Sequence, residues 1–221
     1  MIFRKKIMEW INHIIENQDL ITIVLDSIGT FAFAISGIRL AASKDFDLFG
    51  AYVVGLITAV GGGTIRDLCL NQTPAWMSNY IYLVWTAIAL VFVIIFRKYL
   101  IRLNNTFFIF DTIGLALFTV VGIEKALEFN HPFWVAIIMG TLTGAAGGVL
   151  RDILINQIPL IFRKEIYAIA CIVGGVVYFC CDKVLDDSAA VQIISALSVV
   201  ITRVVAVKYQ ICLPHIKGEG A

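Results

Sequence analysis

Charge is scarce in this chain of 221 residues, because Asp, Glu, Lys and Arg together make up only 15% of it, whereas 60% of the residues are hydrophobic. The mean hydropathy is +0.90. A soluble protein of this size could not bury so much apolar surface, so the composition excludes the soluble globular class and indicates a membrane protein. The formal net charge is only +1. The chain therefore lacks the basic footprint of a nucleic-acid-binding protein, and we expect no nucleic-acid partner.

Residues that build catalytic and metal sites are also few. The three histidines, His13, His131 and His215, are scattered near the termini and in one loop. The five cysteines are odd in number and form no CxxC pair, which argues against a disulfide framework and a zinc site and favours small packing residues. No P-loop, GxSxG or HExxH motif is present. We therefore expect no enzyme, no bound metal and no cofactor.

Long hydrophobic runs dominate the sequence instead, each near the ~20 residues that a helix needs to cross a bilayer. Backbone groups in lipid must be satisfied within their own segment, so helices are expected. The predicted fold is an all-α integral membrane protein. Residues 1–19 have a basic start and an amphipathic continuation, and are expected to form an interfacial segment. The seven predicted transmembrane helices cover Leu20–Ile38, Leu48–Ile65, Tyr80–Phe96, Phe107–Ile123, Pro132–Leu150, Ile166–Cys181 and Ala189–Val207.

An internal duplication organises these helices. The stretch Ala59–Trp76, AVGGGTIRDLCLNQTPAW, recurs 85 positions later as Gly144–Ile161, GAAGGVLRDILINQIPLI, and the gapless register extends over some fifty positions. The chain therefore divides into repeat 1 (20–104), repeat 2 (105–187), a seventh helix (188–209) and a tail (210–221). Because three helices are an odd number, the second copy enters the membrane from the opposite side, which makes the duplication an inverted repeat.

The basic residues favour one orientation. The predicted loops on the side of the C-terminus, together with that end of the chain, carry ten Lys and Arg residues, Arg203 among them, and the opposite side carries five. The positive-inside rule then predicts an outside N-terminus and a cytoplasmic C-terminus in a bacterial plasma membrane.

Glycine is concentrated in helices 2 and 5. Gly costs about 1 kcal/mol relative to Ala inside a helix, so a cluster predicts a break or kink whose free carbonyls suit a cation. The alternative is close helix packing, since small residues let helices approach, and Gly140 and Gly144 continue such a stripe. The clustered residues are Gly61, Gly62, Gly63, Gly147 and Gly148.

Six charged residues lie within the apolar runs, where they are costly and generally face a bundle interior or a watered path. At ~1.5 Å per residue, Asp26 and Arg66 both lie in the outer half of the membrane, and Asp111 and Arg151 both lie in the inner half. The depths predict the pairs Asp26–Arg66 and Asp111–Arg151.

Asp67 and Asp152 follow directly on the two arginines. Helix neighbours at i and i+1 do not face each other, so Arg66–Asp67 is expected to be a poorer pair than Asp26–Arg66. The alternative is that the Arg-Asp residues only snorkel from helix ends. The Asn-Gln-x-Pro tails that follow are interpreted as helix stops.

The doubled motif resembles a known family. Two inverted three-helix repeats plus a seventh helix, with GGGTIRD (Gly61–Asp67) and GGVLRD (Gly147–Asp152), are similar to the bacterial branch of the trimeric intracellular cation channels, sequences also labelled as a bacterial glycine transporter domain. The resemblance implies a homotrimer with one pore per protomer, lined mainly by helices 1, 2, 4 and 5, through which monovalent cations, chiefly potassium, pass. It also implies kinks at both motifs. Ala146 stands where the first motif has Gly61, so the second kink is expected to be milder.

Two functions from different classes follow. In a passive channel for K⁺ or Na⁺, helix carbonyls with Asp26 or Asp111 attract cations, while Arg66 and Arg151 neutralise these carboxylates and limit or gate conduction. In a carrier for glycine or another small zwitterion, an Arg and an Asp hold a carboxylate and an amine. A structural membrane protein without transport is the third reading. In each case the partners are the lipid bilayer and further copies of the chain.

Overall fold

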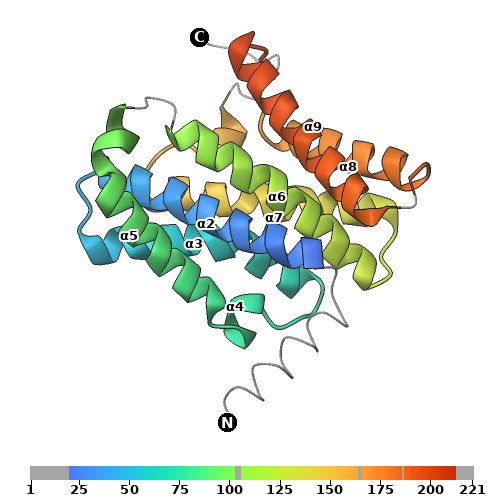
Figure 1. The fold of residues 1–221 in the computed structure, drawn as a ribbon, viewed down its shortest axis with the longest axis horizontal. Coiled ribbons are helices and arrows are strands. Elements are labelled where there is room, and N and C mark those ends of the chain that lie inside the picture. Colours follow the sequence, from blue (N-terminus) through green and yellow to red (C-terminus); the bar gives the residue numbers. More distant parts are fainter. Residues whose placement is uncertain (1–19, 103–105, 164–165, 186, 213–221) are drawn as a thin grey trace, which may run out of the picture.

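Helices form the framework of the protein in the computed structural model, which describes residues 20–102, 106–163, 166–185 and 187–212 (Figure 1). The predicted interfacial segment 1–19 lies outside the described residues. In chain order the elements are α2 (Leu20–Ala42), α3 (Leu48–Cys69), α4 (Ala75–Ser78), α5 (Ile81–Arg102), α6 (Thr106–Glu128), α7 (Phe133–Leu154), η1 (Leu160–Phe162), α8 (Ala168–Asp182) and α9 (Ser188–Lys208).

Six of the seven predicted spans are confirmed as helices long and apolar enough to cross a membrane. The sixth predicted span corresponds to α8, which is apolar but has only 15 residues. At 1.5 Å per residue it covers roughly 22 Å, less than the ~30 Å of a typical hydrocarbon core. The two copies match element by element, since α2, α3, α4 and α5 are followed in the same order by α6, α7, η1 and α8.

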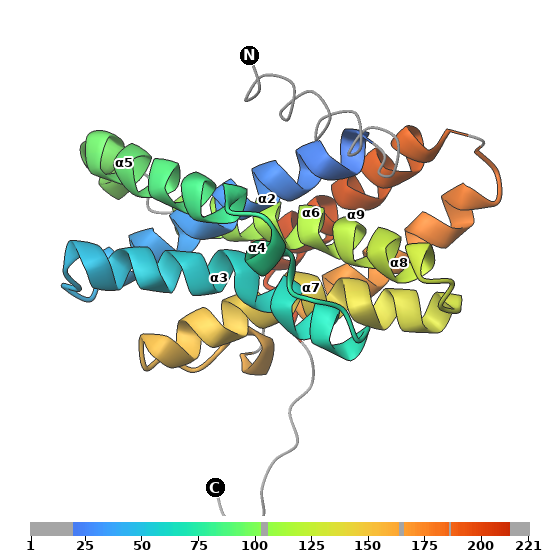
Figure 2. The ribbon, with the colours of Figure 1, turned by 90° about the horizontal axis from the view of Figure 1, so that it is seen from below.

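The repeats pack against each other through equivalent helices. Within the copies, α2 contacts α3 and α5, and α6 contacts α7 and α8; between them, α2 contacts α6, and α3 contacts α7. Figure 1 shows α2 and α6 running in opposite directions, as an inverted repeat requires. The seventh helix breaks this symmetry. It packs on α8 and α6, both from the second repeat (Figure 2).

Each glycine at the α2–α6 crossing makes room for an aromatic ring of the other copy. A Cβ on Gly29 would lie 2.9 Å from the ring of Phe118, and one on Gly114 would overlap the ring of Phe33. The two rings pack edge to face with centroids 5.2 Å apart. Both pairs are related by the 85-residue offset, so the crossing lies on the pseudo-two-fold axis of the duplication.

The α3–α7 crossing explains the glycine motifs. The α-carbon of Gly62 lies against the carbonyl oxygen of Thr143, and that of Gly147 lies against the carbonyl oxygen of Thr58, with no room for a Cβ on either. Helical structure is continuous through both motifs. The predicted break is therefore wrong, because the glycines serve close contact between two intact helices, and the half-helix carbonyls expected to attract a cation are not free. A bend without a break stays a prediction.

The other small residues of α7 also pack as expected. A Cβ on Gly140 would meet the carbonyl oxygen of Thr119 at 2.6 Å, and one on Gly144 would meet the carbonyl oxygen of Leu115 at 2.9 Å. Both contacts lie on α6. The predicted small-residue stripe is thus confirmed over these two positions.

Both motif tails end their helix in the same way. Asn71 and Asn156 adopt left-handed backbone conformations with φ of 55° and 56°. The next backbone N–H, of Gln72 or Gln157, donates to the carbonyl of Asp67 or Asp152 at 2.7 and 2.8 Å. This is the Schellman arrangement, in which the residue after the cap turns left-handed and satisfies the last carbonyls. The interpretation of the tails as helix stops is confirmed.

Candidate functional site

Two buried ion pairs of the same design lie at equivalent positions in the two copies. Arg66 donates from Nε and Nη2 to Oδ1 of Asp67 at 2.9 and 2.7 Å, and Arg151 donates from Nε to Oδ1 of Asp152 at 2.9 Å. The prediction that sequence neighbours pair poorly is wrong here, because the long arginine side chain folds back to reach the adjacent carboxylate. None of the four residues is more than 5% exposed. The snorkelling alternative is also wrong.

The second oxygen of each aspartate fixes the chain beyond the helix. Oδ2 of Asp67 accepts a hydrogen bond from the backbone N–H of Ala75 at 2.9 Å, and Oδ2 of Asp152 accepts one from Leu160 at 3.0 Å. These N–H groups are the first of α4 and η1, directly after a proline. Each aspartate therefore joins its arginine to the start of the next short helix. Asp67 and Asp152, which were predicted as pore charges, thus have a structural role.

The aspartate of the first helix behaves differently in the two copies. In repeat 2, Arg151 Nη1 lies 2.5 Å from Asp111 Oδ1, so the predicted Asp111–Arg151 pair is confirmed. The same Nη1 donates to the hydroxyl of Ser36 at 2.8 Å. Arg203 from α9 adds a second cation, with Nη2 3.8 Å from Asp111 Oδ2. Asp111, Arg151 and Arg203 are at most 1% exposed.

In repeat 1 the predicted Asp26–Arg66 ion pair is wrong. The hydroxyl of Tyr82 on α5 donates to Asp26 Oδ2 at 2.6 Å, and the guanidinium of Arg66 binds Asp67 instead. Asp26 and Arg66 nevertheless lie near each other, as their predicted depths indicated, because both line one pocket. Asp26 is half-buried, whereas its counterpart Asp111 is fully buried.

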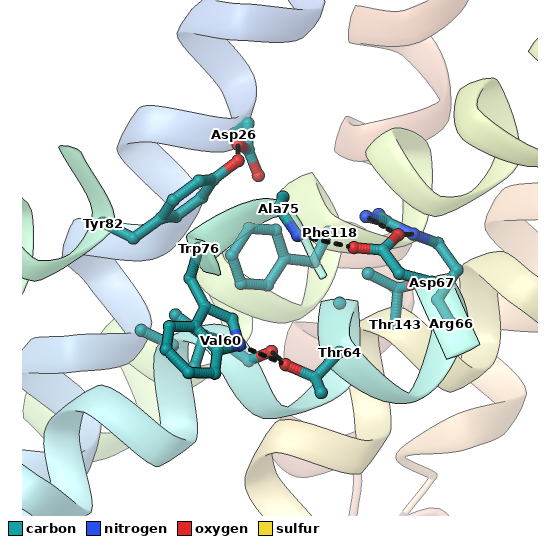
Figure 3. A pocket seen from close by; sticks show the side chains of 12 residues that line it. Asp26, Val60, Thr64, Arg66, Asp67, Ala75, Trp76, Tyr82, Phe118 and Thr143 are labelled. Carbon is teal, nitrogen blue, oxygen red and sulfur yellow. Dashed lines mark hydrogen bonds and ion pairs between the residues drawn. The ribbon is translucent and has the colours of Figure 1, made fainter. Parts of the chain in front are cut away.

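This pocket is called the outer pocket here, after the half of the membrane in which the sequence places Asp26 and Arg66. It holds about 310 Å³ of empty space, part of it open to the surroundings. Figure 3 shows Asp26 and Tyr82 on one wall and Arg66 and Asp67 on another. Trp76 donates from Nε1 to the hydroxyl of Thr64 at 3.1 Å across a third side. The other lining residues are Ala59, Val60, Gly63 and Ala75 from repeat 1, with Phe118 and Thr143 from repeat 2.

The pocket carries an excess of negative charge. It is lined by two carboxylates, Asp26 and Asp67, and by one cation, Arg66, so its formal charge is −1 when both carboxylates are ionised. The equivalent cluster of repeat 2 has two carboxylates and two arginines, and is formally neutral. Of these two clusters, the one in repeat 1 therefore presents an accessible carboxylate, and the one in repeat 2 does not.

Sequence reasoning missed several of these residues. Tyr82 and Tyr167 are 85 positions apart, so the repeat register contained a signal for both, although no charge drew attention to them. Arg203 was assigned to the basic residues on the cytoplasmic side, but it is buried beside Asp111. It lies outside the duplication, so no repeat partner indicated its role. Among the five free cysteines the packing prediction fits Cys171, which is fully buried, but not Cys69, which is exposed.

Comparison with protein families detects the same duplication. The model of a family described as "Glycine transporter" matches twice, at residues 23–98 and 108–183, which are again offset by 85 positions. An *Escherichia coli* protein called UPF0126 inner membrane protein YadS is 38% identical over 195 residues, covering 86% of this chain and 93% of its own. A UPF0126 membrane protein of *Vibrio cholerae* is 37% identical over 195 residues, covering 86% of this chain and 81% of its own.

Solved structures show the same fold. The TRIC trimeric intracellular cation channel orthologue from *Rhodobacter sphaeroides* aligns with a TM-score of 0.82 and 32% identity, over 87% of this chain and 100% of that one. A chain from a study of conductance through TRIC cation channels aligns with a TM-score of 0.79 and 34% identity, over 90% of this chain and 98% of that one. With its doubled helical repeat, the chain belongs to the UPF0126 family of multi-pass membrane proteins, which has the fold of the bacterial TRIC cation channels.

Proposed function

We propose that the protein is a passive channel for monovalent cations, chiefly K⁺, with one conduction path through each protomer. The path begins at the outer pocket and continues between the two repeats, beside the closely packed crossing of α3 and α7. The observation that carries the proposal is the outer pocket itself, in which a half-buried carboxylate, Asp26, lies among polar side chains on the surface where the two copies meet. The similarity to TRIC cation channels at 32–34% identity supports the same activity.

The chemistry of the pocket suits a weakly held cation. The Asp26 carboxylate, the hydroxyls of Thr64 and Tyr82 and the Asp67 oxygens are hard oxygen ligands of the kind that replace water around K⁺ or Na⁺. The site must not bind too tightly, because conduction requires the ion to leave. Arg66 serves this purpose, since its positive charge lowers the attraction of the two carboxylates.

We also propose that the chain forms a homotrimer in a bacterial inner membrane, with its N-terminus outside. The name of the *Rhodobacter sphaeroides* relative describes a trimeric channel, and that of the *Escherichia coli* relative an inner membrane protein. Large apolar side chains on α5 and α9, such as Ile95, Val91, Leu197 and Ile201, are about half exposed or more in the single chain. Lipid and neighbouring protomers would cover them.

Planar-bilayer recording of the purified protein tests the channel. With K⁺ on both sides we expect unitary currents, and with mixed KCl and NaCl a reversal potential that shows permeation by both cations and exclusion of chloride. Asp26→Asn is the informative variant and should lower the unitary conductance most at low ionic strength, where surface charge is least screened. Recordings of the wild type without unitary current would contradict the proposal.

A carrier for glycine or another small zwitterion is the second candidate, because the matching family model is described as a glycine transporter and the pocket holds both a cation and a carboxylate. Arg66 would bind the substrate carboxylate and Asp26 its ammonium group. Counterflow of labelled glycine in proteoliposomes, saturable and without single-channel current, would favour this candidate over the channel.

A further inference from the structure

Two equivalent tyrosines have different partners. The hydroxyl of Tyr82 donates to Asp26 Oδ2 at 2.6 Å. Its counterpart 85 residues later, Tyr167, has a buried hydroxyl without a hydrogen-bond partner in the described part of the chain, and the same is true of Asp111 Oδ2, the atom equivalent to Asp26 Oδ2. A buried polar group without a hydrogen bond is destabilising, so two such atoms belonging to one potential pair need a physical reason.

The position of Tyr167 differs in a specific way. Its hydroxyl lies over Gly148, 2.5 Å from where a Cβ would stand, beside Nη2 of Arg151 at 3.4 Å from the same point. The equivalent Gly63 has no tyrosine above it; the nearest atom to its Cβ position is Nη2 of Arg66 at 3.7 Å, and Gly63 lines the outer pocket. Tyr167 thus fills the space that in repeat 1 is pocket.

Arg203 accounts for this displacement. Its guanidinium donates from Nη1 to the carbonyl oxygen of Ile166 at 3.1 Å and lies 3.8 Å from Asp111 Oδ2. It also stacks on the ring of Tyr167, 4.9 Å from the ring centroid, and on that of Phe108 at 5.2 Å, so release would break the bond to Ile166 as well. It therefore occupies the side of Asp111 from which a tyrosine hydroxyl would approach. Among the described residues of repeat 1 no cation occupies the equivalent place, because α9 lies outside the duplication and packs on α6 and α8.

Space for another position of Arg203 lies on its far side. Arg203 also lines a cavity with about 1000 Å³ of empty space, open to the surroundings, between the start of α6 and the end of α9. Two further cations, Arg163 and Lys208, line the same cavity, and none of the lining residues that the structure describes is acidic. Repulsion from these cations favours the contact of Arg203 with Asp111, while the cavity gives the side chain room to leave.

We propose that Arg203 is a latch that holds the inner half of the conduction path closed. In the latched state, which the structure shows, Arg203 contacts Asp111 and Tyr167 covers Gly148. In the released state Arg203 turns into the basic cavity, the Tyr167 hydroxyl donates to Asp111 Oδ2 as Tyr82 does to Asp26, and an inner pocket opens over Gly148. The effect on conduction rests on the proposed channel function; the switch itself does not.

A double-mutant cycle tests the switch without any current. In the wild type Tyr167→Phe removes an unpartnered hydroxyl, so the melting temperature should change by no more than about 1 °C. After Arg203→Met the hydroxyl bonds to Asp111, so adding Tyr167→Phe should lower the melting temperature by about 2–4 °C. Tyr82→Phe is the matched control and should lower the melting temperature both in the wild type and in Arg203→Met. Equal effects of Tyr167→Phe in both backgrounds would overturn the latch.

A second pair of variants tests the switch by substitution of the two equivalent glycines, in case Arg203→Met does not fold. A Cβ at position 148 displaces the Tyr167 hydroxyl, so Gly148→Ala should favour release, whereas a Cβ at position 63 would make only an ordinary van der Waals contact with Arg66 at 3.7 Å, so Gly63→Ala should not. The fully buried Cys171, one turn after Tyr167, reports the opening. In a chain with Cys171 as its single cysteine, alkylation by a water-soluble maleimide should be several-fold faster in Gly148→Ala and unchanged in Gly63→Ala. An unchanged rate in Gly148→Ala would overturn the latch.

Recordings separate this inference from the proposed function. If the wild type conducts and the latch exists, Arg203→Met and Gly148→Ala should raise the open probability. Absent currents together with the expected thermal coupling and Cys171 alkylation would refute the channel and keep the switch. Normal currents together with additive melting temperatures and unchanged alkylation would refute the latch alone.

Discussion

The two repeats share their packing and differ in their electrostatics. The glycine crossings and the Schellman helix ends are almost superimposable in their contacts. The aspartates on the first helix of each repeat have different contacts. Asp26 is half-buried and accepts a hydrogen bond from a tyrosine, whereas Asp111 is fully buried between two arginines. The comparison teaches that an added helix, α9, can leave the backbone plan of a duplication intact and still give the two copies different chemical roles.

The largest expected effect concerns Asp111 and Arg151. Removing one member by Asp111→Ala or Arg151→Ala leaves an uncompensated buried charge, which typically costs about 3–5 kcal/mol. The double variant should lose less than the sum, with a coupling energy of about 2–3 kcal/mol. Thermal or denaturant unfolding in detergent measures these values.

The same cycle on Asp26 and Arg66 is the control in the other repeat. These residues share a pocket without a direct hydrogen bond, so their coupling should not exceed about 0.5 kcal/mol. Coupling as large as that of the Asp111–Arg151 pair would show that the two repeats are electrostatically equivalent after all.

The next effect tests the symmetric part of the comparison. Gly62→Ala and Gly147→Ala each push a Cβ into a carbonyl oxygen of the facing helix, and overpacking of this kind costs about 1–3 kcal/mol or more. Both should be destabilised alike, as judged by melting temperature. Gly63→Ala, next to one of them, adds a Cβ that meets only Arg66 Nη2 at an ordinary contact distance of 3.7 Å, so it should be neutral or stabilising by up to about 1 kcal/mol. Unequal costs at Gly62 and Gly147 would mean that the crossing is less symmetric than its contacts.

A smaller change is expected in conduction through the outer pocket. Arg66→Gln removes the one positive charge among the described residues that line the pocket and takes its formal charge from −1 to −2. Cation conductance should therefore rise by about two- to threefold at low salt and converge with the wild type near 1 M, where the Debye length is about 3 Å. Arg66→Lys keeps the charge and serves as control. Single-channel recording over a salt series measures the effect, and a conductance independent of residue 66 would place the path elsewhere.

The smallest effect concerns the helix stops. Asn71→Gly and Asn156→Gly should leave stability within about 0.5 kcal/mol of the wild type, because glycine adopts the left-handed conformation freely. Asn71→Ala and Asn156→Ala should each cost about 1 kcal/mol, since a Cβ disfavours that conformation. Unfolding curves measure these changes, and equal changes in stability at Asn71 and Asn156 would confirm that the helix stops depend only on local structure.

Some features could be predicted because they depend on local or periodic properties. The apolar runs and the Asn-Gln-x-Pro helix ends can be read from single stretches of the sequence, and the 85-residue register from comparing two such stretches. The structure has them where expected. Helix depth, obtained by counting residues, predicted the Asp111–Arg151 pair correctly, but the same count predicted the Asp26–Arg66 pair, which is wrong, because depth does not decide which partner a charge takes. The Arg66–Asp67 pair was not predicted, because a rule about facing positions does not describe how far a long arginine side chain can fold back.

The sequence by itself determined the class of protein, the inverted duplication and the places where the helices end, because hydropathy, repetition and helix caps can be recognised from the order of residues without knowing which distant side chains meet. Only the tertiary structure decided whether the glycines break or join helices and which partner each charge takes. Those outcomes depend on side chains from distant segments, such as Tyr82 beside Asp26 and Arg203 beside Asp111, competing for the same few atoms.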